Sequence, residues 1–225
     1  MGILKDLTKE YFGKTVRKED EINIEGLDVD IVTFTDKNKK IHRRGYKPKD
    51  RGNLKDLLKR MIEVRGDEGD FNDIDTSEIE SMEVLFYYNN TFNGDISGWD
   101  VSRVVNMESM CDNATSFNQP IGKWDVSSVE NMSFMFRKAT SFNQPIGDWE
   151  FPNVTDMSFM FRSATSFNQD ISDWKFPKVT NMNCMFQDAT SFNQNISNWE
   201  IYGAKVVYMF YKCPIKDEYK PKIMK

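Results

Sequence analysis

The chain has 225 residues, of which 39% are hydrophobic and 13% aromatic, so it can bury a core and is not a disordered segment. Its net charge of −5 provides no overall attraction for nucleic acid. Its three cysteines, Cys111, Cys184 and Cys213, show no CxxC spacing, which disfavours a disulfide framework or a zinc site and favours buried free thiols in a reducing compartment.

The charge balance changes near Gly66. Residues 1–66 carry 17 Lys/Arg against 12 Asp/Glu, whereas residues 67–225 carry 13 against 23, which predicts a domain boundary. The first residues, "MGILKDLTKEYF", lack the apolar run of a secretory signal, and no apolar run approaches the length of a membrane span. We therefore expect a protein that is cytoplasmic or assembled into a particle rather than secreted.

Residues 1–66 predict a small α+β segment. "ILKDLTKEYF" has one apolar helical face, and "LDVDIVTFTDKNKKIHRRGY" predicts two strands around a "DKNKK" turn. "NLKDLLKRMIEVRG" predicts an amphipathic helix that Asn53 caps and Gly66 ends, with Leu54, Leu57, Leu58, Met61 and Ile62 facing inward. A unit of about 65 residues is marginally stable alone, so we expect it to dock on the following region as a cap.

Residues 67–213 repeat with a period of 25. "SFNQ" occurs at 116–119, 141–144, 166–169 and 191–194, and all five tryptophans follow the same period: Trp99, Trp124, Trp149, Trp174 and Trp199. Such self-similarity predicts stacked units that bury their apolar faces against one another. We expect about five to six units, followed by a charged tail over residues 214–225.

One unit reads "WDVSSVENMSFMFRKATSFNQPIGD" at 124–148. Apolar residues spaced three and four apart predict a short helix near 127–138, and "FNQPIGDW" predicts a short strand. The predicted fold class is therefore α/β: a parallel repeat solenoid of the leucine-rich-repeat type, with one short helix and one short strand per 25-residue coil and a small N-terminal α+β cap.

The "SFNQ" motif has a structural interpretation. The phenylalanine fills the core, and the asparagine lies where the chain turns. Its side chain can bond backbone groups of its own and adjacent coils, which buried turns require. We expect this role for the column Asn93, Asn118, Asn143, Asn168 and Asn193.

The same unit closely resembles the 25-residue unit of the BspA-like, leucine-rich-repeat-type family of bacterial surface proteins and lipoproteins. The shared pattern is W-D-V-S-x-V-x-N-M-x-x-M-F-x-x-A-x-x-F-N-Q-x-I, and the likeness covers about residues 70–213. Members are taken for adhesins or interaction modules, so the resemblance implies binding rather than a particular reaction. A lipid-anchor cysteine found in many members has no counterpart here.

Residues that could carry chemistry are few. The only histidine, His42, has no second histidine or paired cysteine, so no metal site or Ser/His device is expected and a solvated strand residue is favoured. Asp148 and Asp173 stand one period apart, the arrangement of a carboxylate pair in a retaining glycosidase, but no cleft is evident and a solvent-facing column is favoured. We expect no enzyme activity, no cofactor and no small-molecule substrate.

A basic stretch defines a candidate basic patch: Lys39, Lys40, Arg43, Arg44 and Lys47. Such a patch can bind phosphate backbones. Aromatic interleaving is thin, with Tyr46 alone, which disfavours nucleic acid. A solvated face that docks on the acidic repeat region is the favoured interpretation, and an anionic protein partner is the alternative.

The clearest surface candidate comes from two phenylalanines outside the apolar arc. Phe134 and Phe159 are expected side by side on the outer surface, with Ser109, Cys184 and Met209 as their equivalents and Arg137 and Arg162 beside them. They form a candidate partner-binding stripe; the alternative is that each ring lies flat over its neighbour's helix. We expect a non-enzymatic protein-interaction or scaffold module that binds along a solenoid face, or alternatively a glycan-binding or adhesin-like module.

Overall fold

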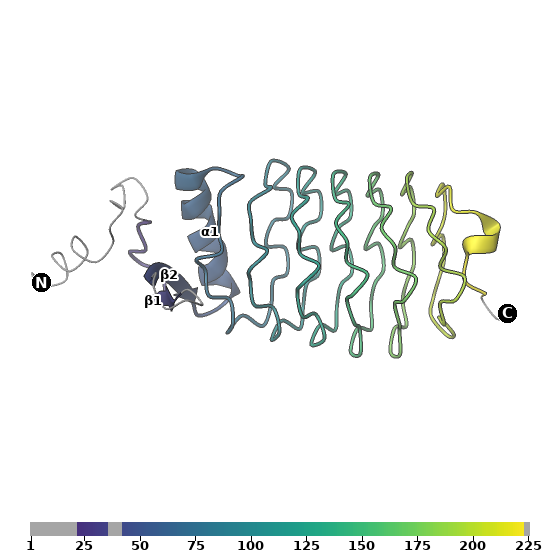
Figure 1. Ribbon diagram of the computed structural model, residues 1–225, viewed down its shortest axis with the longest axis horizontal. Helices are drawn as coiled ribbons and strands as arrows, with labels where there is room; N and C mark the ends of the chain where they lie inside the picture. Colours follow the sequence, from purple (N-terminus) through teal and green to yellow (C-terminus); the bar gives the residue numbers. More distant parts are fainter. Residues whose placement is uncertain (1–21, 36–41, 223–225) are drawn as a thin grey trace, which may run out of the picture.

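The computed structural model describes residues 22–35 and 42–222, so the helix predicted in "ILKDLTKEYF" lies outside the described residues. Regular elements come in the order β1 (Val29–Thr35), β2 (His42–Pro48), α1 (Arg51–Arg65) and the short 3-10 helix η2 (Asp217–Tyr219). Figure 1 shows β1, β2 and α1 at one end of an elongated stack and η2 at the other.

The N-terminal elements agree with the sequence pattern. The two predicted strands are present as β1 and β2, which pair antiparallel with Val29 opposite Pro48, while the predicted "DKNKK" turn lies outside the described residues. Helix α1 ends at Gly66, where φ is 80°, a conformation that glycine adopts without strain. Its N-cap is Asp50 rather than Asn53, because the Asp50 carboxylate accepts a 2.8 Å hydrogen bond from the Asn53 N–H. Of the expected apolar face, Leu54, Leu57, Leu58 and Met61 are buried, and Ile62 is partly buried against the same cluster.

The predicted fold class is wrong. Residues 67–213 contain turns, bends and isolated bridges, and no helix or strand lies among them. The only sheet among the described residues is the two-stranded β1–β2 pair. The structure therefore shows neither the short helix near 127–138 nor the short strand in each coil, and so no α/β solenoid of the leucine-rich-repeat type.

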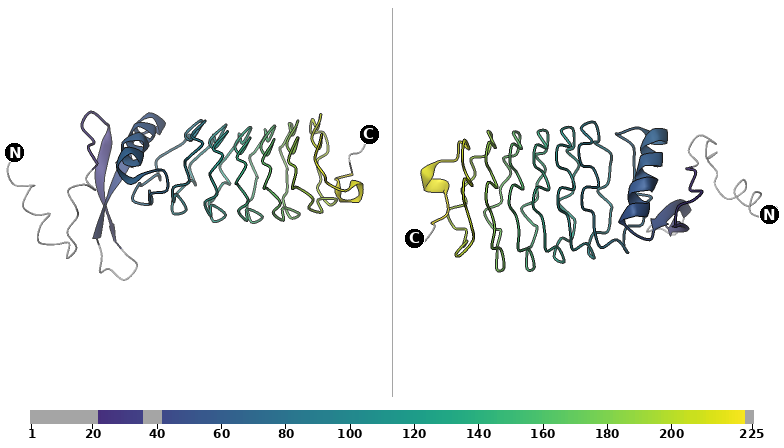
Figure 2. Two further views of the ribbon diagram at one scale, coloured as in Figure 1. Left: turned by 90° about the horizontal axis from the view of Figure 1, so that it is seen from above. Right: turned by 180° about the vertical axis from the view of Figure 1, so that it is seen from behind.

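Segments about 25 residues apart instead lie side by side as stacked layers (Figures 1 and 2). We name the layers by the residues of the isolated parallel bridges that join them: Ser81, Asn106, Asn131, Asp156, Asn181 and Lys205. Each bridge links one layer to the next. A further parallel bridge, Tyr46 to Ile74, joins β2 to the start of the stack.

The seven residues after each bridge residue form what we call a ribbon: 82–88, 107–113, 132–138, 157–163, 182–188 and 206–212. In the 132–138 ribbon, Phe134 and Lys138 have φ of 60° and 58°, and left-handed residues cannot continue a right-handed helix. The N–H groups of alternate residues donate to carbonyls of the next layer, as Phe134 does to Ser158 at 2.9 Å. Intervening N–H groups close turns, as Arg137 does to the Phe134 carbonyl at 3.0 Å. Backbone groups are thus satisfied without a helix.

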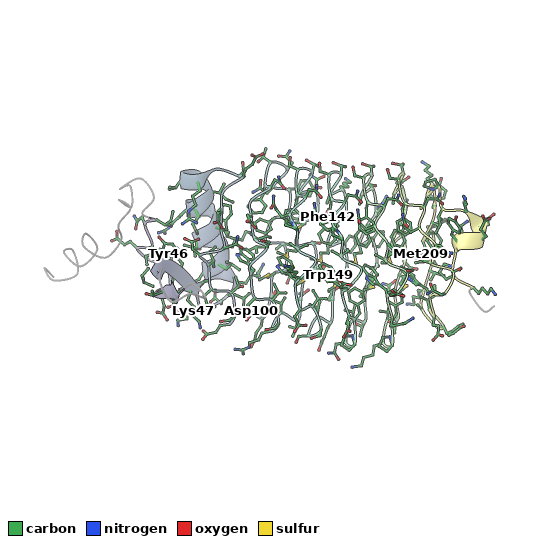
Figure 3. The ribbon with its side chains drawn as sticks, viewed as in Figure 1. Tyr46, Lys47, Asp100, Phe142, Trp149 and Met209 are labelled. Carbon is green, nitrogen blue, oxygen red and sulfur yellow. The ribbon has the colours of Figure 1, made fainter. Side chains whose placement is uncertain are left out.

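One hydrophobic cluster runs through the stack, from Ile22 to Ile215. The "SFNQ" phenylalanines stack in a column, with ring centroids 6.0 Å apart for Phe117 and Phe142, and Figure 3 shows Phe142 and Trp149 in the middle of the stack. The predicted asparagine column is confirmed: Asn118 Oδ1 accepts hydrogen bonds from the Asn143 N–H at 2.9 Å and from Gln144 Nε2 at 3.1 Å. The division into residues 1–66, 67–213 and 214–225 stays a prediction.

Candidate partner-binding surface

The third residue of every ribbon has a positive φ, and these residues form a column along the stack: Val84, Ser109, Phe134, Phe159, Cys184 and Tyr208. The sequence register placed Met209 last in this column. That position is wrong, because the bridge from Asn181 leads to Lys205 and the last layer is therefore one residue shorter. Met209 is buried, and Tyr208 takes the outward position.

Phe134 and Phe159 lie side by side, as expected. Their ring centroids are 4.6 Å apart and their planes differ by 5°, so the rings stack face to face with an offset. Both side chains are half-buried. No helix lies beneath them, so the alternative of a ring covering a neighbour's helix does not hold; each ring covers the other ring instead.

Two arginines flank these rings. The Arg137 guanidinium lies 5.0 Å from the Phe134 ring centroid, and that of Arg162 lies 5.7 Å from the Phe159 centroid, both within cation–π range. Arg137 also binds Asp112 of the preceding layer through Nε and Nη2, and the Nη2–Oδ2 distance is 2.6 Å. The Asp112 carboxylate is 1% exposed. Its hydrogen bonds raise the pKa of Arg137 against the lowering effect of burial.

The structure adds four tyrosines that the sequence analysis did not single out. Tyr87 and Tyr88, in the first ribbon, contact each other edge to face, and Tyr208 and Tyr211, in the last ribbon, do the same. All four are exposed. They stand at the ribbon positions of Phe134, Arg137 and Lys138. The 25-residue register leads to Tyr87 and Tyr88, whereas Tyr208 and Tyr211 reach these positions because the last layer is one residue shorter. We call the combined surface the aromatic–arginine stripe: Tyr87, Tyr88, Phe134, Arg137, Phe159, Arg162, Tyr208 and Tyr211.

The candidate basic patch is described only in part. Lys39 and Lys40 lie outside the described residues, and Arg43 and Arg44 belong to β2 with side chains that are not described. Lys47 binds Glu78 at 3.1 Å and Asp75 at 3.5 Å, and the hydrogen bond with Glu78 is the main reason why its pKa is raised. Lys47 therefore joins β2 to the start of the stack. The role of the other four residues stays a prediction.

The described residues bring together none of the catalytic or metal-binding groups that were considered from the sequence. Asp148 and Asp173 are exposed. Across residues 22–35 and 42–222, no group of three or more His, Cys, Asp or Glu side chains is placed to hold a metal ion. Burial raises the pKa of the free thiols of Cys111, Cys184 and Cys213, which disfavours the reactive thiolate.

Two open hollows border α1, and both are lined mainly by charged side chains. Asp56, Lys59, Arg60 and Glu63 line one, and Asn23, Glu25, Arg60, Glu63 and Val64 line the other. Neither has the apolar lining that is usual for small-molecule sites. In the same described ranges, no helix combines the length and the apolar character needed to cross a membrane.

Comparison with known proteins identifies one family. The family described as "Mycoplasma protein of unknown function, DUF285" matches residues 53–158 and 142–220. No curated protein and no solved structure matches the chain. The resemblance to the BspA-like family is not tested by these comparisons and stays a prediction.

Proposed function

Because this chain belongs to the DUF285 family, whose description names no activity, we propose its function from its own surface: a non-enzymatic protein-interaction or structural scaffold module that binds another protein along the aromatic–arginine stripe. The observation that carries the proposal is the stacked pair of Phe134 and Phe159 with an arginine beside each ring. Tyrosine, tryptophan and arginine dominate the binding energy of protein interfaces, and aromatic residues are enriched there.

The frame beneath the stripe supports binding at low entropic cost. The Phe134 and Lys138 N–H groups donate to the next layer, and Arg137 is held by the buried Asp112 carboxylate. Side chains that are already ordered lose little freedom when a partner docks. The stripe is therefore organised before binding.

Glycan binding, the alternative, receives less support from this geometry. Sugar recognition by an aromatic side chain uses a free ring face. The Phe134 ring already packs on Phe159 and lies against the Arg137 guanidinium. The experiment described next therefore also measures binding to a panel of sugars, as a comparison.

The test compares tagged full-length proteins in capture of partners from an extract of the native source, with quantification by mass spectrometry. Phe134→Ser with Phe159→Ser should lower the yield of specific partners about tenfold or more, since hot-spot truncations cost about 2 kcal/mol or more. Val105→Ser is the matched control, because Val105 is exposed and apolar but lies outside the ribbons. Its capture should equal that of the wild type.

A second variant covers the case in which the double change unfolds the protein. Arg162→Glu replaces one of the two positive charges of the stripe with a negative charge and leaves the buried Asp112–Arg137 pair intact. It should also lower capture. Unchanged capture by both folded variants, or binding that is confined to a panel of sugars, would overturn the proposal.

A further inference from the structure

Backbone–backbone hydrogen bonds between the ribbons all run in one direction. The Phe86 N–H donates to the Met110 carbonyl, the next peptide N–H, that of Cys111, donates to Met135, and Phe136 donates to Met160, at 2.8–2.9 Å. Three more columns follow the same rule, at the first, third and seventh ribbon positions. Every peptide in these columns points its N–H toward the C-terminal end. Within these four columns the dipoles add, as in an α-helix, and their positive pole is the C-terminal end. A column outside the ribbons, from Val105 to Lys205, donates in the opposite direction.

The two ends of these columns have different neighbours. At the N-terminal pole, α1 lies beside the first ribbon, and Arg51 Nη1 donates a 3.0 Å hydrogen bond to the Glu83 carbonyl (Figure 1). At the C-terminal pole, the equivalent donors are the N–H groups of Val206, Tyr208, Phe210 and Lys212. These four N–H groups have no acceptor among residues 22–35 and 42–222. Unpaired backbone groups at an edge are a template for another chain.

Charge and side chains at this edge indicate what it accepts. Residues 201–222 carry five lysines against two acidic residues, and Lys205, Lys212 and Lys216 form no ion pair with a described carboxylate. By contrast, residues 67–200 carry 7 Lys/Arg against 21 Asp/Glu. An occupant of the edge must supply oxygen acceptors, and negative charge on it would be favoured.

A polypeptide fits this edge better than a nucleic acid does. The four donors stand two residues apart, and in every inner layer the groups that fill such a row are polypeptide carbonyls. Beside the row, Val207 is 57% exposed and Tyr208 is 67% exposed. Such an apolar border can pack against a peptide side chain, whereas a charged phosphate backbone gains no contact from it.

We propose that the 206–212 ribbon is a docking edge for an acidic segment of another protein, which adds to the stack as one further layer and accepts hydrogen bonds from the N–H groups of Val206, Tyr208, Phe210 and Lys212. This mode adds a chain to an exposed backbone edge. It differs from binding by the stripe because it uses backbone N–H groups rather than side chains, although Tyr208 and Tyr211 belong to both surfaces.

A second copy of the chain is a poorer occupant for two reasons. Two copies of the 206–212 ribbon cannot pair, because both present donors only. The carbonyl pole that could accept these donors, at the 82–88 ribbon, lies beside α1, and its Glu83 carbonyl already accepts a hydrogen bond from Arg51. Pairing of pole with pole would require α1 to leave the hydrophobic cluster to which Leu57 and Met61 belong.

The experiment uses the full chain and a labelled oligoglutamate peptide, with binding read by fluorescence anisotropy at two salt concentrations. Val206→Pro removes one of the four N–H groups, and Val206 is not among the residues with positive φ, a conformation that proline cannot adopt. Val206→Ala is the matched control, because it shortens the same side chain and keeps the N–H. We expect Val206→Pro to bind about fivefold or more weakly, and Val206→Ala to bind within about twofold of the wild type.

If Val206→Pro does not fold, a variant that changes only a side chain still tests the proposal. Lys212→Glu keeps all four N–H groups, and it should weaken oligoglutamate binding in low salt and have less effect in high salt. Phe134→Ser with Phe159→Ser should leave oligoglutamate binding unchanged, so failure of this proposal and failure of the stripe can be told apart.

Three results would overturn the proposal. The first is wild-type protein that does not bind oligoglutamate. The second is equal binding by Val206→Pro and Val206→Ala. The third is a different occupant: single-stranded DNA that binds more tightly than oligoglutamate with the same sensitivity to Val206→Pro, or self-association in sedimentation that Val206→Pro abolishes.

Discussion

Helix α1 and the 132–138 ribbon bury apolar side chains at similar spacing but have different backbones. In α1, Leu54, Leu57, Leu58 and Met61 are buried, and the N–H groups bond within the helix. In the ribbon, Met132 and Phe136 are buried to the same degree, yet their N–H groups donate to Asp156 and Met160 of the next layer. The ribbon has a ribbon on either side. Helix α1 precedes the first ribbon, so its N–H and C=O groups must find partners within itself.

The same comparison distinguishes the two ends of the stack. At one end α1 satisfies its own backbone, and at the other the 206–212 ribbon retains the geometry of an inner ribbon with no following layer. A ribbon at the end of the stack therefore leaves backbone N–H groups without acceptors, whereas a helix at the end does not. Variants of inner ribbons, of the end ribbon and of α1 should differ accordingly.

The largest difference should separate an inner ring from an end ring. Phe136 is fully buried and stacks on Phe142 at 4.0 Å and Phe161 at 5.7 Å. Phe136→Ala should lower the free energy of unfolding by about 3–5 kcal/mol. Phe210 is partly buried, and its stacking partner is Phe186 at 5.9 Å. Phe210→Ala should cost about 1–2 kcal/mol, because less surface is lost from the core. Urea unfolding checks both, and equal costs would contradict the contrast.

Substitution by glycine should change the stability by a smaller amount, with opposite signs in the helix and in the ribbon. Lys59 is an exposed residue of α1, where glycine is less favourable, so Lys59→Gly should destabilise by about 1 kcal/mol. Lys138 has φ of 58°, a conformation that costs a non-glycine residue about 1–2 kcal/mol, so Lys138→Gly should be neutral or stabilising by up to about 1 kcal/mol. Thermal unfolding of both variants measures the sign. A matching loss in the two would mean that the ribbon behaves as a helix.

The smallest expected effect is a loss of stability at low pH through the Asp170 carboxylate. The Asp170 carboxylate accepts a 2.9 Å hydrogen bond from the Ser172 N–H, and this bond is the main cause that lowers the pKa of Asp170 below 3.8. Because the folded pKa is below the unfolded one, its stabilisation is complete above about pH 4 and is lost as the pH falls through the folded pKa. The unfolding midpoint should therefore decline below about pH 4.

The next layer provides the control. Asn195 takes the place of Asp170 there and accepts a hydrogen bond from the Ser197 N–H at 3.1 Å without a charge. Asp170→Asn should keep the turn and make the decline in acid slightly shallower. A decline that is steeper in Asp170→Asn than in the wild type would contradict the assignment.

Local chemistry was sufficient for several elements. Strands β1 and β2, helix α1 and its end at Gly66 follow from residues close together in sequence. The side-by-side placement of Phe134 and Phe159 and the asparagine column follow from the 25-residue period, since equivalent residues of stacked layers must meet. Tyr87 and Tyr88 could have been found by the same rule, because they precede Arg137 and Lys138 by two periods. Tyr208 and Tyr211 could not, because the last layer is one residue shorter.

Other features were decided only when the layers came together. The spacing of Val129, Met132, Phe136 and Ala139 fits a helix and a ribbon equally well, because both bury residues three and four apart. The choice depends on where each N–H finds its acceptor, and for Phe134 that acceptor is the Ser158 carbonyl, 24 residues ahead. The 25-residue period thus predicted most of the buried side chains and of the contacts between layers, although it placed Met209 outward where Tyr208 lies. The backbone path and the four open N–H groups at the last ribbon follow only from the packed layers, because hydrogen bonds between layers exist only once neighbouring layers are in place.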